Sequence, residues 1–182
     1  MVLLNSDICD FNKEIVDFRL KNINGKIYSS NNLLGDKGTL IMFICNHCPY
    51  VKAIIEKLVE TTIELKNYGI NSIAIMPNDV KNYPADNFEN MKKFAEFYHF
   101  DFPYLIDDTQ EVTKEYKAVC TPDFFGFNQD KKLQYRGRIF ELKNLKIVNY
   151  KNELLDAMKL ISKFKTGPKK QFPSIGCSIK WK

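Results

Sequence analysis

The sequence predicts an α/β fold with a mixed central sheet flanked by helices and an N-terminal β-hairpin. Residues 39–44 and 70–76 are continuous apolar runs, which are typical of strands buried on both faces. Between them, residues 51–62 place apolar side chains at helical spacing and charged side chains on the opposite face. Residues 39–77 therefore predict one β-α-β unit with parallel strands and a right-handed crossover.

Weaker patterns predict the other elements in chain order. Residues 15–20 alternate in polarity, and the Asn- and Gly-rich turn 22–26 joins them to a returning arm at 26–28. A helix, a strand, a short helix, an antiparallel hairpin and a last helix follow the β-α-β unit. Their expected ranges are 87–100 for the helix, 102–106 for the strand, 109–116 for the short helix with Asp108 as its candidate N-cap, 124–127 with 133–136 for the hairpin, and 151–163 for the last helix.

Length and composition indicate one domain over residues 1–182, without repeats or a linker. Residues 166–182 are expected to form a basic, irregular C-terminal tail. The net charge is +5, but the lysines are scattered rather than clustered, which argues against nucleic-acid binding. No apolar run reaches the ~18 residues of a membrane helix, so no membrane association is expected. The first ten residues lack the pattern of a secretory signal, which predicts a cytoplasmic protein.

The chain has five cysteines, and only Cys45 and Cys48 form a close pair. An odd number of cysteines in a chain of this size argues against a structural disulfide framework. Cys-x-x-Cys at the junction of an apolar strand and an amphipathic helix is typical of a redox-active dithiol. A zinc site would need a second pair of ligands at suitable spacing, and Pro49 stands where haem attachment would need a histidine.

Four stretches give the chain a resemblance to a known family. They are residues 43–51 (Phe-Ile-Cys-Asn-His-Cys-Pro-Tyr-Val), residues 82–91 (Asn-Tyr-Pro-Ala-Asp-Asn-Phe-Glu-Asn-Met), residues 120–125 (Cys-Thr-Pro-Asp-Phe-Phe) and residues 176–182 (Gly-Cys-Ser-Ile-Lys-Trp-Lys). Over residues 15–182, the chain resembles a thioredoxin-like redoxin of the alkyl hydroperoxide reductase/thiol-specific antioxidant (AhpC/TSA) superfamily, in the subgroup with Cys-Asn-His-Cys-Pro-Tyr-Val at its active site. It departs from that subgroup at residues 136–141, where acidic residues would be expected directly after Ile139.

The position of the dithiol suggests roles for the residues around it. Cys45 should attack disulfides, because a helix N-terminus and the nearby His47 both favour a thiolate there. Cys48, one turn further into the helix and expected to be more buried, should resolve the mixed disulfide. By favouring the thiolate, the helix N-terminus and His47 would make the disulfide more oxidising. Pro49 is tolerated in the first turn of a helix.

The resemblance also implies a substrate-binding loop. It places a cis-proline at Thr121-Pro122, facing the dithiol, with the backbone of Thr121 available to pair with a substrate strand. Cys120 lies near this loop and is either a small buried side chain or a third redox centre. Cys177 is either an incidental tail cysteine or an accessory thiol that resolves Cys45 or pairs with another chain. Residues 78–79 either line the edge of the site or form a plain turn.

The preferred function is a thiol:disulfide oxidoreductase that cycles Cys45 and Cys48 and serves redox homeostasis or antioxidant defence. It would need no cofactor and no metal, only a disulfide-containing protein or small-thiol substrate and an electron-donating thiol system. A thiol-dependent peroxidase is the first alternative, although Met42 and Gly38 occupy positions where peroxiredoxins build their peroxide pocket. The second is a soft-metal-binding module that uses Cys45, His47 and Cys48.

Overall fold

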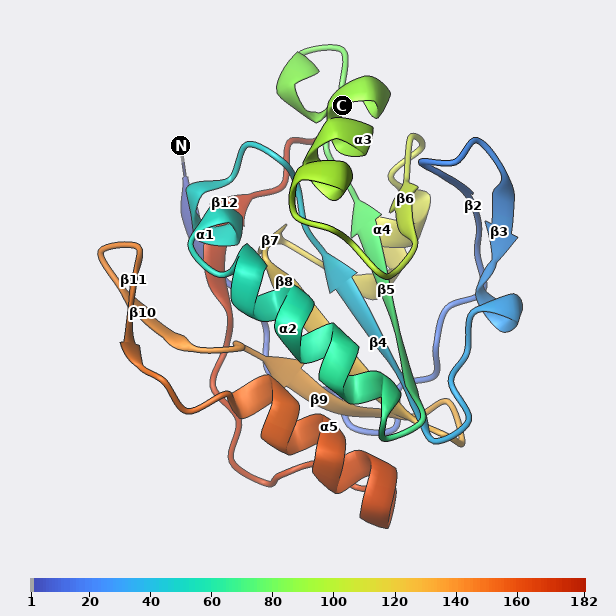
Figure 1. Cartoon of the computed structure of the whole chain (residues 1–182), viewed down its shortest axis with the longest axis vertical. Helices are drawn as coiled ribbons and strands as arrows, with labels where there is room; N and C mark the ends of the chain where they lie inside the picture. The colour runs from blue at the N-terminus through green and yellow to red at the C-terminus, as the bar shows by residue number, and fades with distance from the viewer. Residues whose placement is uncertain (1) are drawn as a thin grey trace.

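A mixed sheet forms the centre of the computed structural model, which describes residues 2–182 (Figure 1). Over this range, seven strands pair in the spatial order β3, β2, β6, β5, β4, β8, β9. Their bounds are β3 Ile27–Ser29, β2 Arg19–Asn22, β6 Tyr104–Ile106, β5 Ile70–Met76, β4 Gly38–Phe43, β8 Asp123–Asn128 and β9 Leu133–Gly137. β4 is parallel to β5 and antiparallel to β8, and β2 and β3 form the predicted N-terminal hairpin. The thioredoxin-like α/β fold is confirmed.

The apolar run of β4 is buried on both faces, as its sequence predicts. Leu40 and Met42 belong to the cluster on one face of the sheet, whereas Ile41 and Phe43 belong to the cluster on the other. Because strand side chains alternate between faces, a central strand covered on both sides must be apolar throughout.

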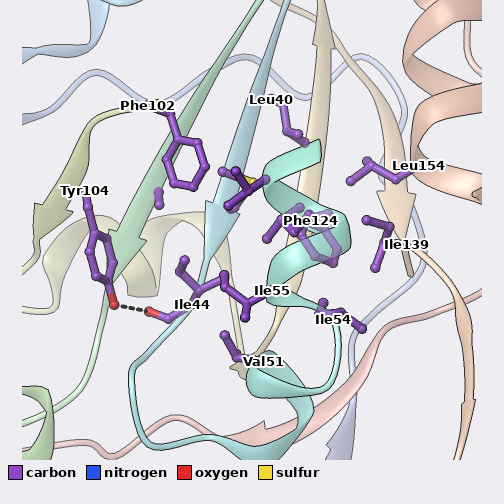
Figure 2. Packing of buried hydrophobic residues seen from close by; sticks show 14 of the residues in the cluster. Leu40, Ile44, Val51, Ile54, Ile55, Phe102, Tyr104, Phe124, Ile139 and Leu154 are labelled. Carbon is purple, nitrogen blue, oxygen red and sulfur yellow. Dashed lines mark hydrogen bonds between the residues drawn. The ribbon is translucent and has the colours of Figure 1, made fainter. Parts of the chain in front are cut away.

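Helices cover both faces of this sheet. Their bounds are α1 Pro49–Lys52, α2 Ile55–Lys66, α3 Phe88–Phe97, α4 Glu111–Tyr116 and α5 Glu153–Phe164. α2 and α5 lie side by side over one face, and α4 lies behind the sheet (Figure 1). Figure 2 shows the core on the α2 side, where Val51, Ile54 and Ile55 gather with Phe124 and other buried apolar side chains.

The predicted helix over 51–62 is interrupted. α1 ends at Lys52 and α2 begins at Ile55, because Ile54 has a non-helical backbone with φ −123°. The interruption turns the Ile54 side chain toward a small hollow that it shares with Pro122 and Phe124. The Cys-x-x-Cys motif therefore precedes a single short turn of helix, which is separated from the longer helix α2.

The C-terminal tail is not irregular throughout, which corrects the prediction for residues 166–182. Ile175–Ser178 form β12, which pairs with β1 (Leu3–Asn5) on one side and with β7 (Cys120–Thr121) on the other. A short segment with Gly, Cys and Ser has little strand propensity of its own. Its conformation depends on pairing with two segments far away in the chain, and local patterns do not report such pairing.

Two further local details differ from the sequence prediction. Asp108 does not cap α4: the N-cap residue is Gln110, and the Asp107 carboxylate accepts hydrogen bonds from the backbone and hydroxyl of Thr113. A small hairpin, β10 (Glu141–Lys143) with β11 (Lys146–Asn149), follows β9 and was not predicted.

Within residues 2–182, no helix combines the length and the apolar character needed to cross a membrane. Met1, the first residue of the predicted domain, lies outside the described residues.

Candidate active site

The Cys45–Cys48 segment connects the end of the central strand β4 to the beginning of α1. Cys48 is the N-cap residue of α1 and Pro49 is its first helical residue. Proline fits this position because the N–H that it lacks would have no partner within the helix. The helix N-terminus is therefore directed at Cys48 rather than at Cys45.

Buried tyrosine Tyr104 supports the start of this segment from the neighbouring strand β6. Its hydroxyl lies 3.0 Å from Asn46 Oδ1 and 3.4 Å from the carbonyl oxygen of Ile44, the contact drawn in Figure 2. A fully buried hydroxyl needs such partners, and here they hold the Ile44 carbonyl before Cys45 and the Asn46 side chain after it.

Three cysteine sulfurs meet at the head of α1. Cys48 Sγ lies 2.7 Å from Cys177 Sγ, and the side chains of Cys45 and Cys48 also form a hydrogen bond. Cys45 Sγ lies 3.3 Å from Thr121 Oγ1, and Cys48 Sγ lies 3.1 Å from the Thr121 carbonyl oxygen. All three cysteines are buried, with exposed fractions of 1% for Cys45, 0% for Cys48 and 1% for Cys177. The expected difference in burial between Cys45 and Cys48 is thus absent.

The environment of these sulfurs favours a thiolate on Cys48. Hydrogen bonds from the Cys177 and Cys45 side chains, with backbone N–H groups of Cys177 and Val51, lower the pKa of Cys48. Burial, the hydrogen bond to Cys48 and the charge of Asp86 raise the pKa of Cys45. The hydrogen bond to Cys48, followed by burial, raises the pKa of Cys177. The expectation of a low pKa for Cys45 is therefore wrong, because its burial was not anticipated.

Protonated Cys48 also has a partner. Its thiol can donate to the Thr121 carbonyl oxygen, whereas its thiolate accepts from Cys45 and Cys177. The residue can therefore gain and lose a proton without leaving its place.

His47 is held by a buried carboxylate that the sequence analysis did not single out. Its Nδ1 lies 2.6 Å from Oδ2 of Asp86, whose side chain is fully buried. Asp86 also accepts hydrogen bonds from the backbone of Asn46 and the side chain of Asn78. The hydrogen bond to Asp86 raises the pKa of His47, and the negative charge of Cys48 contributes in the same direction. The raised pKa favours the positively charged form of His47 near the dithiol, and Asp86 balances much of that charge.

Asp86 lies within residues 82–91, a stretch on which the resemblance rests. No spacing rule connects it to Cys45, because it reaches the site through the short 3₁₀ turn Pro84–Asp86 after β5. Asn78 lines the edge of the site through its contact with Asp86, whereas the Asp79 side chain forms a local turn with Lys81 and Asn82.

The Thr121–Pro122 peptide bond is cis, as the resemblance implies. The backbone of Thr121 is not open to a substrate strand, however, because Thr121 lies opposite Cys177 in the ladder between β7 and β12. β12 is the final strand of the same chain, and it fills the position where a substrate strand was expected. The backbone of Thr121 is covered because residues 175–178, expected to be irregular, form the strand β12.

Cys120 and Cys9 lie apart from the three sulfurs. The buried Cys120 Sγ approaches the carbonyl oxygen of Pro122 at 3.8 Å, and burial raises its pKa. Cys9 is half-buried, and burial raises its pKa to about 11. Neither side chain is placed to exchange directly with the dithiol.

A cavity of about 510 Å³ opens beside His47. Its walls are formed by Val2, His47, Tyr83, Ser178, Ile179, Lys180 and Trp181. The rings of His47 and Tyr83 are stacked, and Lys180 lies over Tyr83. The cavity adjoins the Cys-x-x-Cys segment through His47 and β12 through Ser178.

Known proteins resemble this chain in sequence and in fold. The model of the AhpC/TSA family matches residues 11–136, which is more than half of the chain. An uncharacterized conserved protein from Geobacillus kaustophilus has a structure with a TM-score of 0.95 and 41% identity, covering 100% of this chain and 97% of that one. A hypothetical protein from Sinorhizobium meliloti 1021 has a TM-score of 0.92 and 32% identity, covering 98% of each chain.

More distant structures share the fold. Peroxidoxin BcpB from Mycobacterium tuberculosis has a TM-score of 0.57 and 19% identity, covering 70% of this chain and 83% of that one. Among curated proteins, no sequence matches this chain. On the family match and the two full-length similarities, the chain belongs to the AhpC/TSA family of thioredoxin-like redoxins.

Proposed function

We propose that this protein is a thiol:disulfide oxidoreductase that cycles Cys45 and Cys48 between dithiol and disulfide. The observation that carries the proposal is the Cys45–Cys48 pair at the junction of β4 and α1, whose two sulfurs both contact Thr121 beside the cis-proline. Its substrate would be a disulfide-containing protein or small molecule, and a cellular thiol system would supply electrons. We place it in the Cys-Asn-His-Cys-Pro-Tyr-Val subgroup, with a role in cytoplasmic redox homeostasis or antioxidant defence, and we expect neither nucleic-acid nor membrane partners.

We assign the attack on substrate to Cys45. Cys48 Sγ is crowded by Cys45, Cys177 and the carbonyl of Thr121, which hinders the approach of a bulky protein disulfide to it. As Cys45 attacks, its proton passes to the Cys48 thiolate, which acts as the general base. One substrate sulfur bonds to Cys45, and the other leaves as a thiolate that takes up a proton.

Resolution follows from the same contacts. Cys48 attacks Cys45 Sγ, and its proton goes to the leaving substrate sulfur, so the Cys45–Cys48 disulfide forms and the second substrate sulfur leaves as a thiol. The substrate disulfide gains two electrons and the protein dithiol loses two. Protonated His47 stabilises the Cys48 thiolate, while Asp86 limits this effect and fixes the orientation of the ring.

Insulin reduction driven by a dithiol tests the proposal. The wild type should accelerate the reaction, Cys45→Ser should abolish the acceleration, and Cys9→Ser should retain it. Cys9→Ser is the matched control, because it makes the same chemical change outside the site. No acceleration by the folded wild type, or full activity in Cys45→Ser, would refute the proposal. The reduction potential of the dithiol would then show whether the protein acts as a reductase or an oxidase.

The two alternatives are tested on the same variants. Rapid peroxide consumption that requires Cys45 would favour a peroxidase. Stoichiometric metal in the purified protein would favour a metal-binding module, for which Cys45, His47 and Asp86 place one ligand atom each within 4.8 Å of one another. We rank metal binding below redox exchange because hydrogen bonds from Asn46, His47 and Asn78 already occupy both oxygens of Asp86.

A further inference from the structure

The final strand brings a third cysteine to the dithiol. β12 runs between β1 and β7 and packs against α1, the helix that Cys48 caps. In the register of this ladder, Cys177 lies opposite Thr121, the residue whose carbonyl oxygen contacts Cys48. The 2.7 Å between Cys48 Sγ and Cys177 Sγ is a consequence of this register.

Gly176 provides independent evidence that β12 is fitted closely to this place. A Cβ at residue 176 would overlap the carbonyl oxygen of Thr121 and would lie 2.6 Å from its carbonyl carbon and 3.0 Å from Pro122 N. Only glycine allows the backbone of β12 to come this close to the cis-proline loop. The strand therefore occupies this position by close backbone contact, in addition to the contact between the two sulfurs.

Cys48 thus has two cysteine partners, Cys45 from its own motif and Cys177 from β12. We propose that Cys177 is a third redox cysteine, which exchanges with the Cys45–Cys48 disulfide and forms a Cys48–Cys177 disulfide in the core of the protein. This inference rests on the proposed function, because turnover of substrate is what forms the Cys45–Cys48 disulfide.

The exchange needs no additional oxidant or reductant. The Cys177 thiol loses its proton and its sulfur attacks Cys48 Sγ, so the Cys48–Cys177 bond forms as the Cys45–Cys48 bond breaks. Cys45 leaves as a thiolate and takes up the proton. One disulfide and one thiol are present before and after the step, so the protein as a whole is neither oxidised nor reduced.

The exchange would change what the substrate encounters. In the Cys45–Cys48 form, a reduced substrate can attack Cys45 and reverse the reaction. In the Cys48–Cys177 form, Cys45 is a thiol again and the residue that meets the substrate is no longer part of the disulfide. Reversal by the released product would then first require Cys45 to attack Cys48 and reopen the Cys48–Cys177 bond.

Disulfide mapping of the full chain tests this inference. The reduced protein is oxidised with oxidised glutathione, trapped with an alkylating reagent at acidic pH, digested and analysed by mass spectrometry. Wild type should contain the Cys48–Cys177 disulfide at least as abundantly as Cys45–Cys48. Cys45→Ser should still form Cys48–Cys177. Only Cys45–Cys48 in wild type with Cys177 fully alkylated, or only a glutathione adduct on Cys48 in Cys45→Ser, would overturn the proposal.

A serine at residue 177 separates redox exchange from simple support of Cys48. Cys177→Ser keeps a hydrogen-bond donor beside Cys48 but cannot form a disulfide. If Cys48–Cys177 is preferred tenfold over Cys45–Cys48, the wild-type reduction potential should be more negative than that of Cys177→Ser by about 30 mV. Equal potentials would show that Cys177 only positions Cys48. Circular dichroism confirms that each variant is folded.

The outcomes distinguish this inference from the proposed function. If the wild type reduces insulin but contains only Cys45–Cys48, the third-cysteine inference fails and the oxidoreductase stands. If Cys48–Cys177 forms but folded wild type does not accelerate insulin reduction, Cys177 is a redox cysteine and the proposed activity fails.

Discussion

Gly176→Ala should loosen β12 from the cis-proline loop and separate Cys177 from Cys48. The added Cβ would lie 2.6 Å from the Thr121 carbonyl carbon, where ordinary contact begins at 3.4 Å. Because backbone atoms cannot move aside as a flexible side chain does, β12 must retreat by about 1 Å at a cost of about 1–3 kcal/mol. A displacement of about 1 Å can slow a reaction between positioned groups by about 100-fold.

The assay measures how fast Cys48–Cys177 forms on oxidation in a Cys45→Ser background, with urea unfolding as the parallel measure of stability. Gly25→Ala is the matched control. Gly25 has φ +84° in the turn between β2 and β3, and nothing lies within 4 Å of the position of an added Cβ. Alanine there should cost about 1–2 kcal/mol through backbone strain alone, so it lowers stability without moving β12.

Gly176→Ala should slow formation of the Cys48–Cys177 disulfide roughly 10- to 100-fold relative to Gly25→Ala. The ultraviolet absorbance of the Cys48 thiolate should also decrease at neutral pH, because Cys177 makes the largest contribution to lowering its pKa. If both glycine variants form the disulfide at the wild-type rate and Gly176→Ala is no less stable than wild type, the close docking of β12 is wrong.

Two buried ion pairs give further predictions. Asp86→Asn should lower the pKa of His47, measured by NMR with His99 as the internal reference. Because the pKa of His47 is raised in the folded protein, the stability from this pair is complete below the ordinary value of 6.5 and is lost as pH rises through the raised value. Urea unfolding should therefore show a larger loss for Asp86→Asn at acidic than at alkaline pH, and a pH-independent loss would contradict the pairing. Arg136→Leu should cost about 3–5 kcal/mol because it leaves the buried Asp123 carboxylate unpaired. Burial raises the pKa of Asp123 to about 6 even though Arg136 lowers it, so removal of Arg136 should raise that pKa further. The cost should therefore shrink as pH falls toward 6, and adding Asp123→Asn should restore most of it; an equal cost at every pH would argue against an unpaired charge.

The features that the sequence predicted correctly are those encoded over short distances. The continuous apolar run of β4 and the helical spacing of α2 report burial directly, because each is set by its own residues. The cis bond at Pro122 was implied by resemblance to a family and not by local pattern. These features locate the dithiol at the end of a buried strand, which is enough to propose its chemistry.

The sequence placed the lowered pKa on Cys45 because the motif does not show which other groups surround its two cysteines. Hydrogen bonds from Cys177 and Cys45 are the largest causes that lower the pKa of Cys48, with backbone N–H groups of Cys177 and Val51 adding to them. Burial is the largest cause that raises the pKa of Cys45. Cys177 comes from a distant strand, so its effect on Cys48 cannot be read from the motif.

Cys177 could not be placed from the sequence for a different reason. Its segment has little strand propensity, and its position is set by a ladder with β7 that lies more than fifty residues earlier in the chain. Side chains in a strand alternate between faces, so a slip of one residue in this ladder would point Cys177 away from the dithiol. Gly176 prevents the slip, because any side chain at the position of residue 176 would collide with the Thr121–Pro122 backbone. The order Gly-Cys at residues 176–177 thus sets the register between β12 and β7 and places the Cys177 thiol beside Cys48. This relation can be recognised only from the paired strands.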